Sequence, residues 1–393
     1  MKRLPRRTLL RLIPLALPFL SATCAHQEAR FELASPVPAV DGDGFDGALF
    51  QSVGARLLPG HRWEIANDAA VFDRHVEAID GARSSVDIVI YIWHSGTPSD
   101  RVVAALARRR GIACRVVADA VGSPDFTDKV APALRAAGCD TRIFRPLTGG
   151  PSLDRNHRKI IVVDGRVGFV GGFGIRKEWL GGAATGGDAV WRDTSVRIEG
   201  PAVHDLQRAF AQNWQEAGGA LLPPAEFPEA AATGGVRVAA VTSTAAHVTD
   251  AARLTALAVG AARHRLWIWN AYFIPDAALL SLLARKGREG VDVRLLLPGD
   301  KNDVKTVTPL QRKTYPELRA AGVRVFEYAP AMMHAKVTLV DDRIAVIGSI
   351  NLDAMSLRWQ EESAVVIEDS AIVTALARDW EADAAHCKEV TAR

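Results

Sequence analysis

Two short stretches of this sequence carry the same histidine–lysine pattern. In each, a histidine is followed two residues later by a lysine, seven later by an aspartate and fourteen later by a glycine. The two sets are His157, Lys159, Asp164 and Gly171, and His334, Lys336, Asp341 and Gly348. A neutral imidazole can attack phosphorus, a protonated one can supply a proton to a departing alkoxide, and ammonium groups stabilise the growing negative charge. The doubled pattern therefore predicts nucleophilic chemistry at a phosphodiester.

The residues around each pattern predict a β-hairpin. Lys159–Val163 and Val337–Val340 are rich in β-branched residues, and each run is followed by a turn pair that begins with aspartate. Because side chains two apart on a strand share a face, each histidine is expected on the same side as its lysine. Asp164 and Asp341 fall in the predicted turns, so we interpret them as residues that brace the hairpins.

A two-residue turn would set the register of the second hairpin. His334 would then face Ser349, and Lys336 would face Ile347. Asn351 would extend the same face, so Ser349 and Asn351 are candidate neutral donors to a phosphate. The first copy has glycines at the corresponding positions, Gly172 and Gly174, which predicts a lopsided phosphate site.

This paired signature resembles that of the phospholipase D superfamily. Its surroundings, Trp-Asn-Ala-Tyr-Phe-Ile-Pro at 269–275 and Gly-Ser-Ile-Asn-Leu-Asp at 348–353, are most similar to those of bacterial cardiolipin synthases. The resemblance covers roughly residues 60 to 390. It implies an α/β fold of two duplicated lobes, with mixed sheets flanked by helices and one active site at the interface between the lobes.

The resemblance also implies roles for individual residues. It identifies His157 as the nucleophile and His334 as the general acid and base, and the reverse order is also compatible with the pattern. In the family an acidic residue some thirty positions on orients a histidine, which places Glu362 behind His334 and Asp193 behind His157. A solvated acid at a strand edge is the alternative for both. His94 follows the first predicted strand and either faces the ligand or is an exposed loop histidine.

The order of predicted elements occurs twice along the chain, and Leu-Arg-Ala-Ala-Gly is present at both 134–138 and 318–322. The chain therefore reads as a duplicated unit. We expect a first lobe at 35–222, a linker rich in Pro, Ala and Gly at 223–235, and a second lobe at 236–393. An extra loop is expected in the first lobe at about 148–153.

Residues 1–25 predict an export signal or membrane anchor, because basic residues precede an apolar run that ends in small residues. The segment resembles a twin-arginine signal and, more weakly, a lipoprotein signal, so we expect a location in the bacterial cell envelope. Cys114 and Cys139 are interpreted as small buried side chains, with a disulfide as the alternative in an exported chain.

Composition narrows the functional classes. The net charge is only +3, and no basic stripe with interleaved aromatic residues is present, which argues against a nucleic-acid partner. No dense cluster of ligand-type residues predicts a metal, so no cofactor is expected. Aromatic and apolar residues near the motifs either form an apolar rim for acyl chains or pack in the core. They are Trp179, Leu180, Trp191, Tyr272, Phe273, Met332 and Met333.

The resemblance favours a phosphatidyltransferase. It would pass a phosphatidyl group from one phosphatidylglycerol to another through a phosphohistidine, releasing glycerol at a membrane surface. The alternatives are a phospholipase D that forms phosphatidic acid, an exported nuclease, and a non-catalytic lipid-binding module. The internal duplication predicts that a monomer contains the complete site.

Overall fold

The computed structural model describes residues 31–34, 36–42, 44–149, 153–187, 190–229 and 231–391. The predicted signal at 1–25 lies outside them. Within the described ranges, no helix is both long enough and apolar enough to cross a membrane.

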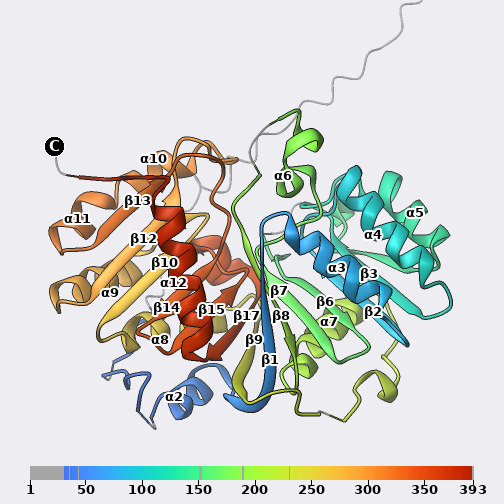
Figure 1. The fold of residues 1–393 in the computed structure, drawn as a ribbon, viewed down its shortest axis with the longest axis horizontal. Helices are drawn as coiled ribbons and strands as arrows, with labels where there is room; N and C mark the ends of the chain where they lie inside the picture. Colours follow the sequence, from blue (N-terminus) through green and yellow to red (C-terminus); the bar gives the residue numbers. More distant parts are fainter. Residues whose placement is uncertain are drawn as a thin grey trace, which may run out of the picture.

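One large mixed sheet runs through both lobes (Figure 1). The first-lobe strands are β1 (Leu58–Asn67), β2 (Ser85–Ile90), β3 (Ala113–Asp119), β4 (Asp140–Phe144), β5 (Arg155–Asn156), β6 (Lys159–Val163), β7 (Val167–Gly171) and β8 (Thr194–Glu199). Those of the second lobe are β9 (Val236–Ser243), β10 (Arg265–Trp269), β12 (Asp292–Pro298), β13 (Arg324–Tyr328), β14 (Val337–Val340), β15 (Ile344–Gly348), β17 (Gln360–Glu368) and β18 (Cys387–Glu389). Two short strands, β11 (Phe273–Ile274) and β16 (Leu352–Asp353), pair apart from it.

The strand order makes the duplication visible. The first lobe contributes β4-β3-β2-β6-β7-β8-β1, and the second contributes β13-β12-β10-β14-β15-β17-β9, with β18 at the outer edge. Within each lobe the first three strands are parallel and the hairpin strands are antiparallel. The lobes meet where β1 pairs with β9, so the predicted two-lobed α/β fold with mixed sheets is confirmed.

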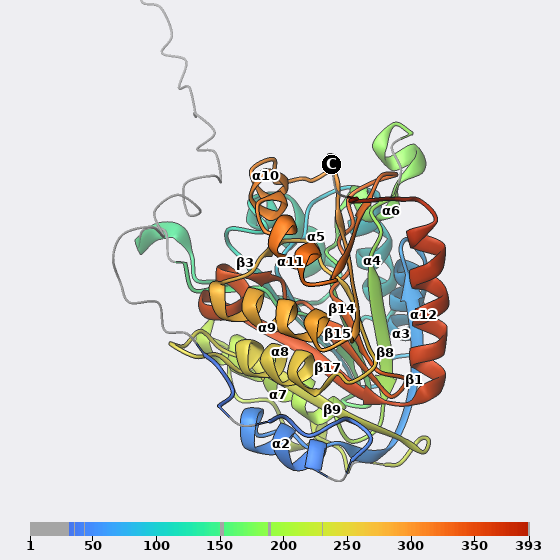
Figure 2. The same ribbon diagram turned by 90° about the vertical axis from the view of Figure 1, so that its left-hand side faces the viewer.

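Helices cover both faces of the sheet. Figures 1 and 2 show α3 and α12 on one face and α7, α8 and α9 on the other. The main helices are α3 (Ala70–Asp80), α4 (Thr97–Arg108), α5 (Ala131–Ala136), α7 (Val203–Glu216), α8 (Asp250–Ala261), α9 (Ala277–Arg288), α11 (Tyr315–Ala320) and α12 (Ser370–Ala384). The shorter ones are α6 (Lys177–Leu180), α10 (Val307–Arg312), η2 (Phe126–Val130), η3 (Leu147–Gly149), η4 (Gly182–Thr185), η5 (Pro224–Glu226) and η6 (Met355–Trp359).

The helix α2 (Gly44–Val53) packs with the second lobe, although it precedes the first in the chain. Its Phe45 and Leu49 are buried in the same core as Leu254 and Leu257 of α8. The predicted first lobe, 35–222, therefore contains a helix that belongs spatially to the other lobe. Apolar burial decides this placement, because α8 presents an apolar surface that α2 covers.

The two hairpins form where the sequence predicts them, but the predicted register was wrong by one residue. Val340 pairs with Ile344 and Ile347 pairs with Val337, so three residues lie in the turn. Asp164 and Asp341 adopt positive φ values of 56° and 51°, which aspartate tolerates. This conformation allows a third residue into each turn, and His334 therefore does not pair with Ser349.

Cys114 and Cys139 form a disulfide, so the prediction that they pack as separate apolar side chains was wrong. Arg115 of β3 pairs with Asp140 of β4 in a parallel ladder. The residues immediately before this pair are consequently neighbours, and their Cα atoms are 4.5 Å apart. Such a separation suits a disulfide.

Candidate active site

Each histidine motif is held against a segment of the other lobe. The strand β5 runs parallel to the start of β17, and the His157 amide donates to the Glu361 carbonyl at 2.8 Å. In the second copy, Met333 bridges to Arg192, and the His334 amide donates to the Arg192 carbonyl at 2.7 Å. The backbone thus brings both motifs to the seam between the lobes, about an approximate two-fold relation.

The acids behind the histidines are exchanged between lobes. His157 Nδ1 lies 2.9 Å and 3.1 Å from the two carboxylate oxygens of Glu362. His334 Nδ1 lies 2.8 Å from Asp193 Oδ2. The predicted pairing of each histidine with the acid of its own lobe was therefore wrong. The reason is the strand crossing, because β5 lies against β17 and delivers His157 beside the residue that follows Glu361.

Different donors hold the two acids. The hydroxyls of Ser349 and Ser356 both donate to Glu362. Asp193 instead accepts from the Trp179 indole nitrogen at 2.8 Å and from the Thr194 amide at 2.8 Å. All of these side chains are buried. Both carboxylates are consequently fixed in orientation, and each fixes one imidazole.

These contacts explain the glycines of the first copy. A Cβ at Gly172 would lie 2.3 Å from Asp193 Oδ1, and one at Gly174 would lie 2.8 Å from Ile92 Cβ and 3.0 Å from the Trp179 ring. The space that Ser349 and Asn351 fill in the second copy is thus occupied by Asp193 and Trp179 in the first. The missing hydroxyl is replaced by the indole N–H.

The two lysines turn back toward their histidines. Lys159 Nζ donates to the His157 carbonyl at 2.7 Å. Lys336 Nζ lies 2.9 Å from His334 Nδ1 and also donates to the His334 carbonyl. Both lysines are buried, so their charges act through a medium of low polarity.

Aromatic rings enclose the histidines. The Tyr91 ring centre is 4.9 Å from that of His157. On the other side, Trp179 lies edge-on to His334 at 5.0 Å, and Trp191 stacks on it at 5.5 Å. The rings restrict the imidazoles to the orientation that the acids select.

Burial is the largest influence on the pKa values of the histidines and acids in the site. It lowers the pKa of His157 and of His334 well below the ordinary value, and the charges of both lysines lower each further. Burial also raises the pKa of Glu362 to about 8 and that of Asp193 to about 6. The combination of a charged imidazolium with a charged carboxylate is thus disfavoured in both histidine–acid pairs.

The same burial lowers the pKa of Lys159 to about 7 and that of Lys336 to about 8, although neighbouring carboxylates oppose the shift. An anionic phosphate placed between these lysines would favour their charged forms. The site is therefore built to gain most of its electrostatic stabilisation when an anion binds.

Asp164 and Asp341 lie at the turns, where they contact backbone. Asp164 accepts from the amides of Arg83, Ser84 and Ser85, which precede β2. Asp341 accepts from those of residues 263–265, which precede β10. Each aspartate ties its hairpin to the neighbouring strand, as the sequence predicts.

Three other predicted residues have contacts that bear on their roles. The Ser349 hydroxyl donates to Glu362 and accepts from the Ser363 amide at 3.0 Å. Asn351 is buried, and its backbone N–H donates to Ser356 Oγ at 3.1 Å. The His94 ring contacts the Gly122 carbonyl at 3.2 Å and lies 3.7 Å from Asp125. Both of these residues lie in the loop after β3.

Sequence reasoning missed Ser356 and Arg158, and it missed the role of Trp179 as a donor to an acid of the site. Ser356 holds Glu362, Trp179 holds Asp193, and Arg158 is buried between the lobes. Arg158 donates to the Ser243 carbonyl at 3.0 Å and to Asn213 Oδ1 at 2.8 Å. The position of Arg158 between His157 and Lys159 was the available signal, because an arginine in a buried strand requires several acceptors.

Core packing, the alternative to an apolar rim, accounts for five of the seven residues considered, because Trp179, Trp191, Phe273, Met332 and Met333 are buried. Leu180 and Tyr272 are only half-buried. Large exposed side chains occur instead at Leu147, Leu153 and Trp359.

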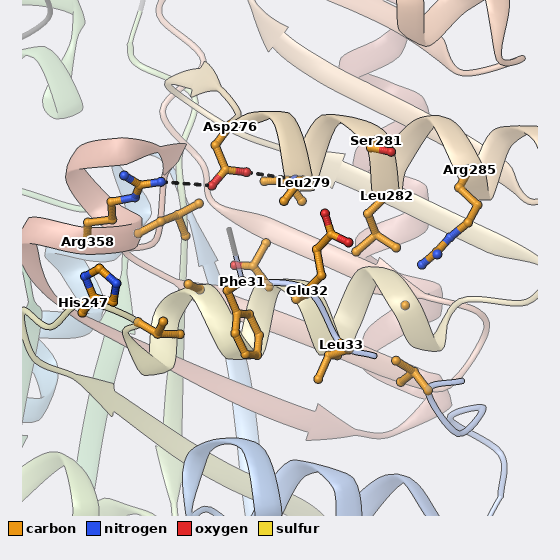
Figure 3. Close-up of a pocket in the computed structure, with 18 residues that line it drawn as sticks. Phe31, Glu32, Leu33, His247, Asp276, Leu279, Ser281, Leu282, Arg285 and Arg358 are labelled. Carbon is orange, nitrogen blue, oxygen red and sulfur yellow. Dashed lines mark hydrogen bonds and ion pairs between the residues drawn. The ribbon is translucent and has the colours of Figure 1, made fainter. Parts of the chain in front are cut away.

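A pocket in the second lobe lies between α8 and α9 and beneath the segment that contains Phe31 and Leu33 (Figure 3). Leu357 and Arg358 of η6 line one end of it, and Arg358 pairs with Asp276 at 3.5 Å. Neither motif histidine lines this pocket, so it is distinct from the seam. Among the residues that the structure describes, no group of three or more His, Cys, Asp and Glu is arranged to hold a metal ion.

The sequence matches the family described as "Cardiolipin synthase, PLD-like domain" twice, at residues 75–214 and 257–384. Each match contains one histidine–lysine motif. The two regions together cover more than half of the chain.

Curated relatives include cardiolipin synthase 1 of Bacillus anthracis, which is 33% identical over 346 residues, or 83% of this chain and 67% of that protein. Cardiolipin synthase A of Pseudomonas fluorescens (strain SBW25) is 38% identical over 314 residues, or 78% of this chain and 65% of that protein. This chain thus spans about two thirds of the length of these relatives.

Among solved structures, the chain resembles phosphatidylserine synthase from Haemophilus influenzae Rd KW20. The TM-score is 0.66 with 13% identity, over 88% of this chain and 92% of that chain. At this identity the likeness concerns the fold alone.

Proposed function

Because this chain belongs to the cardiolipin synthase family of phospholipase D-like proteins, we propose that it transfers a phosphatidyl group from one phosphatidylglycerol to another. The observation that carries the proposal is the pair of buried histidines at the seam, each oriented by an acid of the opposite lobe and accompanied by a lysine. Such a pair supplies both a nucleophile and a proton donor.

In the first step, His157 would attack the phosphorus of phosphatidylglycerol. Its Nδ1 faces Glu362, so Nε2 is the nitrogen available for attack. The new P–N bond forms as the bond from phosphorus to the glycerol oxygen breaks, and His334, whose protonated form the bound anionic phosphate favours, protonates that oxygen. Lys159 and Lys336 would bind the non-bridging oxygens and stabilise their charge in the transition state.

In the second step, the free hydroxyl of a second phosphatidylglycerol attacks the phosphohistidine. Its oxygen bonds to phosphorus, its proton passes to His334, and the electron pair of the P–N bond returns to His157. Two molecules of phosphatidylglycerol thereby yield one cardiolipin and one glycerol. The two steps use the same groups in opposite directions.

Such substrates reside in a lipid bilayer, so the site must approach a membrane surface. Leu153 lies two residues before β5 and Trp359 one residue before β17, and the parallel pairing of these strands begins at Arg155 and Gln360. Leu153 and Trp359 are both large and exposed, at 45% and 43%. They lie a few residues before His157 and Glu362, and we infer that they face the bilayer.

The test is an assay of the full chain with acyl-labelled phosphatidylglycerol vesicles. We expect cardiolipin and glycerol, whereas phosphatidic acid alone would favour hydrolysis and would refute the transferase proposal. His157→Ala and His334→Ala should each abolish turnover. His264→Ala, a change at an exposed histidine whose recorded contacts are made by its backbone, is the matched control and should leave turnover unchanged.

The phosphohistidine itself can be trapped. Phosphoramidates survive alkaline quenching, so peptide mass spectrometry should find a phosphatidyl adduct on His157 in the wild-type protein during turnover. An adduct on His334 instead would reverse the assigned roles.

A further inference from the structure

An exposed carboxylate lies beside the seam and takes no part in the chemistry above. Asp303 follows β12, and both of its oxygens accept from the Tyr272 hydroxyl, at 2.9 Å and 3.0 Å. The loop that carries it is ordered by the neighbouring Asn302, whose side-chain oxygen accepts from the Val304 amide at 2.9 Å. Asp303 is thus held in a defined position although it is exposed.

Through Tyr272, Asp303 lies close to the second histidine–lysine motif. The Tyr272 ring lies edge-on to His334, with centres 6.2 Å apart, and Lys336 Nζ is 6.0 Å from the centre of the Tyr272 ring. Although Asp303 is exposed, the neighbouring protein partly desolvates its carboxyl and raises its pKa, whereas the Tyr272 hydrogen bond and the charges of Lys336 and Arg176 lower it. The charge of Asp303 also helps raise the pKa of Tyr91, after the larger effects of burial and of Asp119.

Asp303 differs from the nearby acid of its own loop. Asp300, three residues earlier, pairs with Arg312 at 2.8 Å. Within the described residues, the recorded side-chain partner of Asp303 is a neutral hydroxyl. A carboxylate near a phosphate site weakens anion binding, so its presence there implies a different ligand group. A hydroxyl of an uncharged headgroup fits, because it donates a hydrogen bond that a carboxylate accepts strongly.

We propose that Asp303, oriented by Tyr272, accepts a hydrogen bond from a hydroxyl of the incoming glycerol headgroup and so favours a polyol acceptor over water. The inference rests on the proposed transferase function and adds its acceptor determinant. The hydroxyl that attacks phosphorus gives its proton to His334, and the bond from phosphorus to His157 breaks. The neighbouring hydroxyl remains intact and is the one that Asp303 holds.

Two acceptors that differ by one hydroxyl test this directly. Labelled phosphatidylglycerol vesicles are incubated with the full chain and an equal excess of 1,2-propanediol or 1-propanol, and the two phosphatidyl-alcohol products are quantified beside phosphatidic acid. For the wild type we expect a higher yield with the diol. Asp303→Asn should lower the ratio of diol product to propanol product by roughly tenfold, the order expected for one hydrogen bond to a charged group.

Two further variants sharpen the result. Tyr272→Phe keeps the ring and removes the hydroxyl that orients Asp303, so the ratio should fall by a smaller factor. Asp300→Asn removes an exposed acid of the same loop whose partner is Arg312, and it should leave the ratio unchanged. Because the readout is a ratio within one preparation, it does not depend on how much of each variant folds.

The outcomes separate this inference from the proposed function. A wild-type protein that consumes no phosphatidylglycerol overturns the function itself. An active wild type with an unchanged ratio in Asp303→Asn overturns the role of Asp303. Equal loss of both alcohol products and phosphatidic acid also overturns it, because the residue would then serve the fold or the histidines.

Discussion

The two motif histidines carry the same functional group but are held by different supports. Glu362 is held by two serine hydroxyls, and Asp193 by one indole and one amide. Burial raises the pKa of Glu362 to about 8 but that of Asp193 only to about 6. The duplicated halves thus differ around identical reactive groups, as the two proposed roles would require.

Gly172 provides a test of the support for Asp193. In Gly172→Ala the added Cβ would lie 2.3 Å from Asp193 Oδ1, so the carboxylate must move and His334 loses its orientation. We expect turnover to fall roughly 100-fold, as displacements of about 1 Å in active sites do. Gly47→Ala, where an added Cβ meets nothing within 4 Å, is the control and should keep wild-type turnover.

The lysines predict a pH dependence. Burial lowers the pKa of Lys159 to about 7 and of Lys336 to about 8, so the free protein loses both cations as pH rises through this range. Binding of an anionic phosphate should weaken accordingly, and kcat/KM should fall above about pH 8. A Lys159→Arg/Lys336→Arg variant keeps its charges, so this fall should vanish from its profile whatever its absolute rate.

The free energy of unfolding is expected to change in the opposite direction over the same pH range. The unfolded chain keeps both lysines protonated to about pH 10 and so binds more protons than the folded protein. The contribution of these lysines to the free energy of unfolding therefore increases as pH rises from about 7. A loss of activity accompanied by a parallel loss of thermal stability would contradict the lysine explanation.

At the level of elements, the short parallel contact between β5 and β17 determines the site. It places Glu362 next to His157, and the equivalent bridge between Arg192 and Met333 places Asp193 next to His334. Neither lobe alone can contain a complete histidine–acid pair. The seam is therefore as much a part of the site as the motifs are.

The disulfide is a second link between elements, and it predicts a measurable stabilisation. Cys114 and Cys139 close a loop of 25 residues between β3 and β4. Cross-linking a loop of this length stabilises a fold by about 3 kcal/mol, by restricting the unfolded chain. The Cys114→Ala/Cys139→Ala variant should unfold at lower temperature, and a reductant should lower the midpoint of the wild type but not that of the variant. Equal midpoints before reduction would refute the stabilising role.

At the level of the whole molecule, one continuous sheet joins the lobes. The pairing of β1 with β9 joins the two lobes, and α2, which precedes the first lobe in the chain, packs in the core of the second lobe. This continuity keeps the two histidines in register. The exposed Leu153 and Trp359, which precede the paired strands β5 and β17 of the two lobes, form the membrane-facing surface that we infer.

This surface predicts how the protein meets its substrate. Leu153→Ala/Trp359→Ala should weaken sedimentation with phosphatidylglycerol vesicles roughly tenfold or more, because two large apolar side chains no longer enter the bilayer. Phe50→Ala removes a similarly exposed ring, at 44%, from α2 and should have no effect. Equal vesicle binding by all three proteins would exclude this face as the membrane contact.

The sequence by itself determined the reactive groups, the duplication and the fold class. These features depend on local spacing, since the motif residues lie within one hairpin and strand periodicity is a short-range property. The hairpin strands Lys159–Val163 and Val337–Val340 consequently form where they were predicted.

Only the tertiary structure decided which acid serves which histidine. Glu362 and His157 are 205 residues apart, and Asp193 and His334 are 141 apart, so no local pattern connects them. The same holds for the disulfide, for the placement of α2 and for the orientation of Asp303 by Tyr272. Each depends on how strands from distant parts of the chain pair and pack, because non-local contacts form only when the whole sheet assembles.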